Sequence, residues 1–369
     1  MRLTFLASLG MIAAATAHAS AKATCEQPTV CCEEPKPGPF AFSFPPERDI
    51  ACSQNFYVYA EGLAFQAKQD GMEFAARADQ GTTQTFLRGE LAAFDNDRHN
   101  WKYQPGMRFG LGSYLNYDAW NFNCSWTWVH ITNYETIHAP DLGLLGGKPS
   151  SVVVPFWGLG LNADTLTATC VWNASYNVLD FQLGKPYHLS HAVKCLLHAG
   201  ARLAWINQHL SQHYGNLLNT VFSGPIQHGD NHFWGIGGRI GLDTDWLVGK
   251  GWSLFANVSS SMLSGNFLIK QKIEPTVATN GAEISNFDIQ RHMHQNMPNL
   301  EMAFGLSWKQ HFLNNRYQIS LQGAYEFIEW FDQLNLRKFI AGALTYPSDI
   351  VSRGNLTMNG FSLRLQLDM

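Results

Sequence analysis

The sequence predicts an all-β protein, a transmembrane antiparallel up-and-down β-barrel with an even number of strands. Three observations predict it. Two adjacent segments between Trp101 and Thr132 alternate apolar and polar residues and are separated only by a tight turn at 116–118. The N-terminus resembles a secretory signal peptide, and no run of about 18 apolar residues follows it. Long and short links alternate between the predicted strands.

The hairpin between Trp101 and Thr132 carries the clearest pattern. In its first segment the odd positions are apolar and the even positions are polar, charged or glycine, so the two sets lie on opposite faces of a strand. From Trp101 to Leu111 the strand rises about 33 Å, which projects to about 25 Å at a tilt near 40°. That height matches the apolar band of an outer-membrane barrel and exceeds the usual soluble strand, which runs about five or six residues.

The ends and the composition place the barrel in the chain. Residues 1–19 are expected to be a signal peptide cleaved near Ala19, residues 20–54 a Cys/Pro-rich periplasmic extension, and residues 55–369 the barrel. Charged residues make up 15% of the chain, below the roughly 25% of soluble domains. The net charge of −4 and the absence of a basic run argue against a nucleic-acid partner.

Eight further segments complete the prediction of ten strands. They span 56–68, 166–183, 195–205, 234–242, 252–262, 299–309, 317–327 and 361–369. In the first, aromatic residues lie on both faces and Glu61 sits in the middle, so its faces stay unassigned. In the second, apolar residues move from even to odd positions after Val178, and we expect a β-bulge there.

The links predict the topology. The short ones are 115–119, 184–194, 244–251 and 312–316, and the long ones are 69–100, 133–164, 209–231, 266–297 and 331–354. Short periplasmic turns and long external loops, with both ends of the barrel periplasmic, fit this alternation. Three loops could each hide another hairpin, so the count could reach about 16. Ten strands enclose a narrow, filled lumen, whereas about 16 enclose an aqueous channel.

The alternation also predicts which side chains line the lumen. The predicted pore-lining residues are Lys102, Arg108, Asn121, Asn123, Arg202, Arg239, Glu301, Lys309, Glu326 and Arg364. With Asp180 and Asp368 added, six basic groups face four acidic ones, which favours a slight preference for anions. The alternative is that these charges pair across the wall and fill the barrel.

Tryptophans and cysteines have structural roles in this prediction. Trp101, Trp120, Trp252 and Trp308 lie near strand ends and are expected to be interfacial anchors, with Trp205 and Trp234 as further candidates. The disulfide candidates all precede the first strand and are Cys25, Cys31, Cys32 and Cys52. A zinc site there is the alternative, but the adjacent pair at 31 and 32 lacks the usual spacing.

Two patterns are compatible with other chemistry. His209 and His213, and His292 and His294, are spaced as metal ligands could be, but both pairs fall in predicted loops without carboxylate ligands, so no metal or cofactor is expected. Ser259, Ser260 and Ser261 could join loop histidines in a hydrolase site. The spacing does not support such a site, and the sequence predicts a protein without enzymatic activity.

Several blocks resemble one family in their order. They include the run from Phe56 through Glu61 to Glu73, the segment 105–112 with Trp120 and 125–128, and the segments 179–185, 200–206 and 234–244. Together these are similar to the Legionella-type major outer membrane proteins, cysteine-bearing porins also found in chlamydia-like bacteria. The resemblance implies a pore-forming barrel with disulfides between subunits. The chain departs from the usual aromatic last residue of such barrels, since it ends in Met369.

The predicted function is therefore passive diffusion of ions and small hydrophilic solutes through a porin in the bacterial outer membrane. The alternative is a structural or adhesive envelope barrel cross-linked through its N-terminal cysteines. The expected partners are outer-membrane lipid, small hydrophilic solutes, and further copies of the chain or other envelope proteins joined by disulfides.

Overall fold

The structure is a computed structural model, and it describes residues 55–80, 86–92, 102–115, 120–139, 144–145, 148–149, 151–155, 165–217, 226–273, 276–277, 283–284, 287–313, 316–340, 348–351 and 353–369. The chain divides into two units, Met1–Pro35 and Lys36–Met369, and the second contains every described residue. The predicted signal peptide, the extension and its four cysteines lie outside the described residues.

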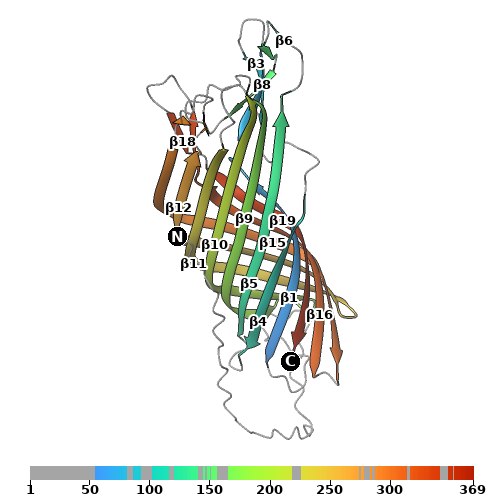
Figure 1. Cartoon of the computed structure of the whole chain (residues 1–369). Helices are drawn as coiled ribbons and strands as arrows, with labels where there is room; N and C mark the ends of the chain where they lie inside the picture. Colours follow the sequence, from blue (N-terminus) through green and yellow to red (C-terminus); the bar gives the residue numbers. More distant parts are fainter. Residues whose placement is uncertain are drawn as a thin grey trace, which may run out of the picture. The chain divides into compact units, whose positions relative to one another are not determined.

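Ten long strands form the wall. Their bounds are β1 Phe56–Gln69, β4 Gln104–Tyr114, β5 Asn121–His138, β9 Thr165–His188, β10 Val193–Leu217, β11 Ile226–Gly249, β12 Trp252–Ile273, β15 Phe287–Phe312, β16 Tyr317–Leu334 and β19 Gly354–Asp368. Each pairs antiparallel with the next in this order, and β19 pairs with β1. The ring is closed, which confirms the predicted all-β up-and-down barrel with ten strands (Figure 1).

Short turns join the strands at one end. Described residues there include 189–192 between β9 and β10 and 250–251 between β11 and β12. Gly249 and Gly251 have φ values of 121° and 79°, in the region that favours glycine, so the β11–β12 turn depends on them. Backbone hydrogen bonds between Phe56 and Met369, 2.9 Å and 3.4 Å long, hold the start and the end of the wall together at this end.

The opposite end carries the small strands. These are β2 Ala75–Gln80, β3 Phe86–Ala92, β6 Leu144–Leu145, β7 Lys148–Pro149, β8 Ser151–Pro155, β13 Thr276–Val277, β14 Glu283–Ile284, β17 Arg337–Ile340 and β18 Ser348–Val351. The hairpin β2–β3 extends the wall through β8, which pairs with β9. The predicted extra hairpins therefore exist, but none of the described ones enlarges the ring.

The wall strands are longer than predicted. Much of the predicted loop 209–231 is strand, since β10 continues to Leu217 and β11 begins at Ile226. Likewise β12 extends to Ile273 and β15 begins at Phe287. The predicted positions of both histidine pairs in loops are therefore wrong, because all four histidines lie within β10 and β15. The alternation did not reveal the strands around these histidines, because the outward residues there are polar and form no apolar outer face.

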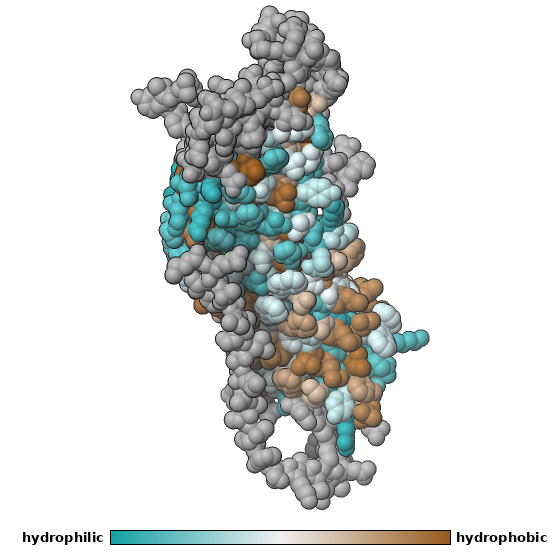
Figure 2. Space-filling view, viewed as in Figure 1, coloured by the Kyte–Doolittle hydropathy of each residue, from teal (hydrophilic) through white to brown (hydrophobic). Residues whose placement is uncertain are grey.

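The polarity of the wall inverts along its length. Nearer the short turns, the outward residues are large and apolar, for example Ile240 with 65% of its surface exposed and Phe304 with 62%. Further along, outward residues such as Asn207, Lys270 and His294 are polar, and the inward ones are buried and apolar. Figure 2 shows the apolar surface over one part of the wall and the hydrophilic surface over the other. The first part is suited to lipid and the second to water.

Strand β9 shows this inversion within one strand. Its even residues point inward throughout, from Cys170 and Trp172 to Asp180. Leu179 and Phe181 point outward toward the apolar surface region. Its pairing with β5 and β10 runs without a register shift through this point, so the predicted β-bulge is wrong. The apolar residues change position because the surroundings of the strand change, while its geometry stays regular.

Pairs of tryptophans mark the limits of the apolar surface. Trp252 lies directly opposite Trp308 near the short turns, and Trp205 lies opposite Trp234 further along the wall. Trp234 is opposite Asn266, so about 14 residues of β12 separate the two levels, or roughly 33 Å at a tilt near 45°. This distance matches a hydrocarbon core of about 30 Å. Among the described residues there is no helix of the length and apolarity that a membrane crossing requires.

Candidate pore lumen

Two groups of ion pairs lie inside the barrel. The first, called the Arg202 group, consists of Asp180, Arg202, Arg239 and Glu301. Arg202 is 1% exposed and donates two hydrogen bonds of 2.7 Å to the Asp180 carboxylate and two, of 2.5 Å and 2.9 Å, to Glu301. Arg239 also contacts both carboxylates. A guanidinium can remain charged in such a buried position only with partners of this kind.

The second group, called the Arg108 group, consists of Glu61, Arg108, Glu326 and Arg364. Arg108 Nη1 lies 3.0 Å from Glu61 Oε2, and its Nη2 lies 2.9 Å from Glu326 Oε2. Arg364 Nη2 lies 3.1 Å from the same Glu61 oxygen, and its guanidinium carbon is 4.4 Å from the centre of the Tyr59 ring. The two groups together span strands on most sides of the ring.

The strand register places these charges together. Glu61 on β1 lies directly opposite Arg108 on β4 and Arg364 on β19, so three neighbouring strands present alternating charges in one row. Asp180 on β9 is in the same way opposite Arg202 on β10. Oppositely charged residues in such positions stabilise strand pairing. The register therefore explains part of each group, whereas Glu326, Arg239 and Glu301 reach their partners across intervening strands.

The charges in the two groups balance. Four arginines face four carboxylates, and every one has a partner within 3.1 Å. This arrangement corresponds to the alternative in which charges pair across the lumen and fill it. The predicted excess of basic over acidic groups is therefore wrong at this level, partly because Glu61 had no assigned face.

Three cavities lead from the short turns to the ion groups. The largest, about 940 Å³, is lined by turn residues including Lys250 and by Lys309, His311 and Asp368, and we call it the vestibule. The next, about 210 Å³, shares Asn121 and Lys309 with it. The third, about 130 Å³, lies among the ion groups and shares Asn123 and Arg364 with the second. The three spaces thus adjoin one another in this half of the barrel, and the two inner ones are lined mainly by polar side chains.

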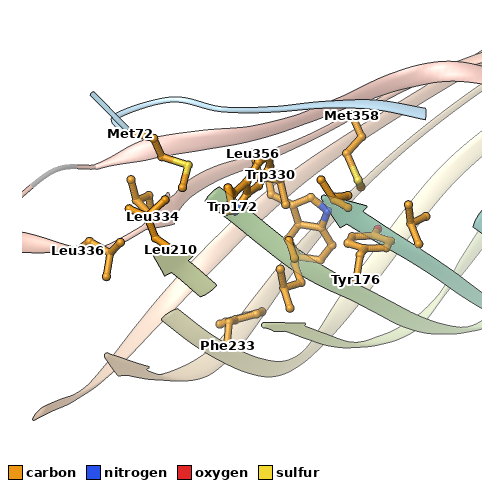
Figure 3. Packing of buried hydrophobic residues seen from close by; sticks show 14 of the residues in the cluster. Met72, Trp172, Tyr176, Leu210, Phe233, Trp330, Leu334, Leu336, Leu356 and Met358 are labelled. Carbon is orange, nitrogen blue, oxygen red and sulfur yellow. The ribbon is translucent and has the colours of Figure 1, made fainter. Parts of the chain in front are cut away.

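Beyond the ion groups the lumen is filled by apolar side chains, which we call the apolar plug (Figure 3). Phe233 and Phe267 have ring centres 4.7 Å apart, and Trp330 meets Tyr176 edge-on at 6.1 Å. The Arg202 guanidinium lies 5.9 Å from the Trp330 ring, so the plug begins directly at the Arg202 group. Trp330 is 0% exposed. Among the described residues, the plug thus fills this part of the lumen with buried side chains.

The sequence matches the family described as Legionella pneumophila major outer membrane protein precursor over residues 51–369. The chain belongs to this family. This membership, with the closed ring of lipid-suited strands, makes it an outer-membrane β-barrel protein.

Comparison with individual proteins adds little. No curated protein matches the sequence. Among solved structures, the outer membrane protease OmpT from Escherichia coli is 8% identical, with 86% of this chain and 97% of OmpT covered and a TM-score of 0.41. A FadL homologue from Pseudomonas aeruginosa is 10% identical, with 90% and 92% covered and a TM-score of 0.29. At such low scores these likenesses carry no argument about function.

Within this member of the major outer membrane protein family, most of the predicted lining residues point inward. Arg108, Arg202, Arg239, Glu301, Glu326 and Arg364 form the ion groups, and Asn121, Asn123 and Lys309 line the cavities. The prediction for Lys102 is wrong. Its Nζ lies 4.0 Å from the ring centre of Tyr134, an outward residue of β5 with 54% of its surface exposed. Lys102 precedes β4, where the strand alternation no longer applies.

The structure places the predicted tryptophan anchors in different positions. Trp252, 49% exposed, faces outward opposite Trp308, while Trp120 lies at the β4–β5 turn under Lys185. Trp101 lies outside the described residues. The sequence analysis missed an outer aromatic row, in which Tyr103, Phe361, Tyr325 and Phe304 follow one another with ring centres 5.2–6.1 Å apart. Their alternation was visible, but only the register brings them together.

The residues considered for other chemistry do not assemble. Ser259 accepts a hydrogen bond from Arg239 inside the barrel, whereas His294 lies on the outer wall, bonded to Asn266 and Ser264. The described residues contain no group of three or more potential metal ligands. Cys124, Cys170 and Cys195 are free thiols. The apolar plug was the main feature that sequence reasoning missed, and its signal was the change of phase in β9.

Proposed function

We propose that this outer-membrane barrel is a pore for ions and small hydrophilic solutes, that transport is passive, and that no catalytic step is involved. The observation that carries the proposal is the series of cavities from the vestibule to the ion groups, of which the two inner ones are lined mainly by polar side chains. A barrel whose interior only had to be filled could use mainly apolar side chains throughout, as its other half does. Charged and hydrated side chains facing a lumen are instead what conduction requires.

The proposed pore is closed in this structure and differs from a permanently open diffusion channel. Ten strands enclose little free space once side chains are counted. Here the apolar plug occupies the lumen beyond the ion groups, with Trp330 and Trp172 both fully buried. Conduction therefore requires the plug to rearrange, and we expect brief, infrequent openings of small conductance.

Reconstitution of the purified full-length protein in a planar bilayer tests the proposal. We expect stepwise currents. In a salt gradient, Lys309→Gln should shift the reversal potential toward cation selectivity, because Lys309 lines two of the cavities and is only 32% exposed. Lys270→Gln is the matched control, since Lys270 is exposed on the outer wall and should leave the reversal potential unchanged. Absence of stepwise currents under all voltages and salt conditions would contradict a pore.

A structural envelope barrel is the second candidate, and the apolar plug is the observation that favours it. A filled lumen suits a protein that only has to stabilise the membrane or hold other envelope components. Under this alternative the purified protein carries no current, and its deletion weakens the envelope against detergents. We also propose that the N-terminal cysteines link copies of the chain or join it to other envelope proteins, whichever candidate is correct.

A further inference from the structure

The apolar plug has one component that leaves the regular pairing of the wall strands. Strand β16 pairs regularly with β19 up to Trp330, after which the register shifts before Leu334. Asp332, within the shift, has a φ of 53°, a conformation uncommon outside glycine. Its N–H donates to Asn355 Oδ1 at 3.1 Å. The chain changes direction at this point, and we call the residues that follow, 333–337, the strap.

The strap crosses the inside of the barrel. Asn231 on β11 donates a 2.7 Å hydrogen bond to the Gln333 carbonyl oxygen, although β12 and β15 separate β11 from β16 in the ring. Gln271 on β12 donates to the Arg337 carbonyl at 2.8 Å and accepts from its N–H at 3.0 Å. Both Asn231 and Gln271 are buried, inward-pointing side chains. Two side-chain amides therefore hold the strap's backbone against the inner faces of β12 and β11, two and three strands away from β16.

Two leucines of the strap fill the end of the lumen that lies away from the short turns. Leu334 and Leu336 are 0% and 1% exposed, and Figure 3 shows both beside Leu210 at one end of the plug. The wall opposite has a glycine where Leu336 approaches. A Cβ on Gly229 would lie 3.2 Å from Leu336 Cδ1, closer than ordinary contact. The absence of a side chain at this position leaves space for the strap.

The way the strap is held differs from the way the wall is held. Wall strands share continuous ladders of backbone hydrogen bonds on both sides. Within the described part of the chain, the strap has only two isolated pairings, Leu334 with Gly354 and Arg337 with Val351, and otherwise depends on Asn231, Gln271 and apolar contacts. Segments held by few contacts open at lower free energy than the strands around them. The strap can therefore leave the lumen with the loss of one pairing, Leu334 opposite Gly354, while the regular β16–β19 ladder up to Trp330 stays intact.

We propose that the strap is the gate of the pore, and that the outer end of the lumen opens when residues 333–337 leave it. This inference rests on the proposed pore function and adds the element that controls it. In the closed state Leu334 and Leu336 occupy the path. In the open state they lie outside it, and the polar cavities connect with the outer mouth after the neighbouring plug side chains rotate.

Two variants on the same strand test the gate by conductance. Gly229→Leu places a side chain in the space that Leu336 occupies, and it should raise the ratio of open to closed time about tenfold or more. Gly238→Leu is the control, because a Cβ at Gly238 meets nothing within 4 Å and the residue faces outward. Gln271→Ala, which removes two hydrogen bonds from the strap, should have the same effect as Gly229→Leu. Gln290→Ala on the outer wall is its control.

A chemical measurement separates the gate from the pore. Leu336→Cys, in a background with all seven native cysteines replaced by alanine, should react slowly with a water-soluble thiol reagent, and Gly229→Leu should accelerate the reaction by the factor seen in open time. Equal conductance and equal labelling in Gly229→Leu and Gly238→Leu, with both proteins folded by gel mobility, would refute the gate and leave the pore standing. Accelerated labelling without current in any variant would refute the pore, while showing that the strap moves.

Discussion

At the residue scale, the pairing of charges within the two ion groups allows the barrel interior to hold eight charged side chains. Each arginine contacts at least one carboxylate at 3.1 Å or less, and Arg202 and Asp180 are nearly inaccessible to solvent. Removing water from these charges costs free energy that only complete pairing offsets. Losing a single partner within an ion group should therefore lower the stability of the protein strongly. Losing an exposed ion pair should lower it much less.

Arg202→Met should lower the free energy of unfolding by about 3 to 5 kcal/mol, because Asp180 and Glu301 stay buried while one of their cations is lost. Lys68→Met, which breaks an exposed ion pair with Asp70, should cost less than about 1 kcal/mol. Urea unfolding in detergent, followed by tryptophan fluorescence, compares the two. Equal midpoints would show that the Arg202 group is not what stabilises this half of the lumen.

Cys170 should be chemically inert in the folded protein. Burial, with a contribution from Glu135, raises the pKa of its thiol well above the usual range, so the reactive thiolate is scarce at neutral pH. A maleimide should label it only after unfolding. Ser211→Cys, on the outer face of the neighbouring strand, should be labelled at once in the folded protein, with mass spectrometry identifying the sites. Rapid labelling of native Cys170 would mean that the plug around it is open.

At the element scale, β9 shows that one strand can serve two environments. Its 24 residues keep one direction of alternation, and the side chains exchange polarity near Val178. Inside, Trp172 and Tyr176 give way to Asp180, and outside, Asn173 and Ser175 give way to Phe181. The boundary between lipid and water is thus encoded in the order of side chains rather than in a break of the strand.

Two substitutions on the outer face of β9 test this boundary. Phe181→Arg places a charge on the lipid-suited surface and should cost about 2 to 4 kcal/mol of stability in liposomes, less if the site is close to the headgroups. Asn173→Arg, eight residues away on the same face, should cost close to nothing because water surrounds it. Folding into liposomes over a urea series measures both. A similar cost at the two positions would mean that the outer wall has a single environment.

The sequence was sufficient where one rule of alternation held over a whole segment. Around Met107 and Trp126, for example, polar residues face the lumen and apolar residues face the exterior, so the alternation identified both faces of the strand. The same alternation in the other segments led to the prediction of ten strands joined by short turns at one end. It was insufficient where the exterior became water, because His209 and His292 on a polar outer wall resemble loop residues. Pairing between distant strands was also hidden: Glu326 meets Arg108 across two intervening strands, and the strap meets Gln271 through its backbone, which leaves no mark in the residue pattern.

At the scale of the whole molecule, the barrel combines two interiors in one ring of strands. The half near the short turns has polar cavities and an apolar exterior, and the other half has an apolar core and a polar exterior. The first depends on lipid for its stability and the second resembles a water-soluble protein. The N-terminal cysteines, outside the described residues, add a further level of organisation that we propose to be intermolecular.

The native protein should migrate as a high-mass oligomer on denaturing gels without reductant and as a monomer with it, because exported cysteines form disulfides. Replacing Cys25, Cys31, Cys32 and Cys52 by serine should abolish the oligomer. Replacing Cys124, Cys170 and Cys195 instead is the control and should leave it intact, since these thiols lie within the wall. If migration does not respond to reductant, the N-terminal cysteines pair within one chain or stay reduced.

The length of the strands also determines how far the barrel wall extends beyond the membrane. Strand β10 continues for about 12 residues beyond Trp205, which carries the wall roughly 28 Å past the aromatic level at the tilt used above. The rim thus stands about one bilayer thickness above the lipid. Because the short turns of outer-membrane barrels are periplasmic, this collar would project from the outer side of the membrane, and molecules approaching the cell would meet it before the lipid.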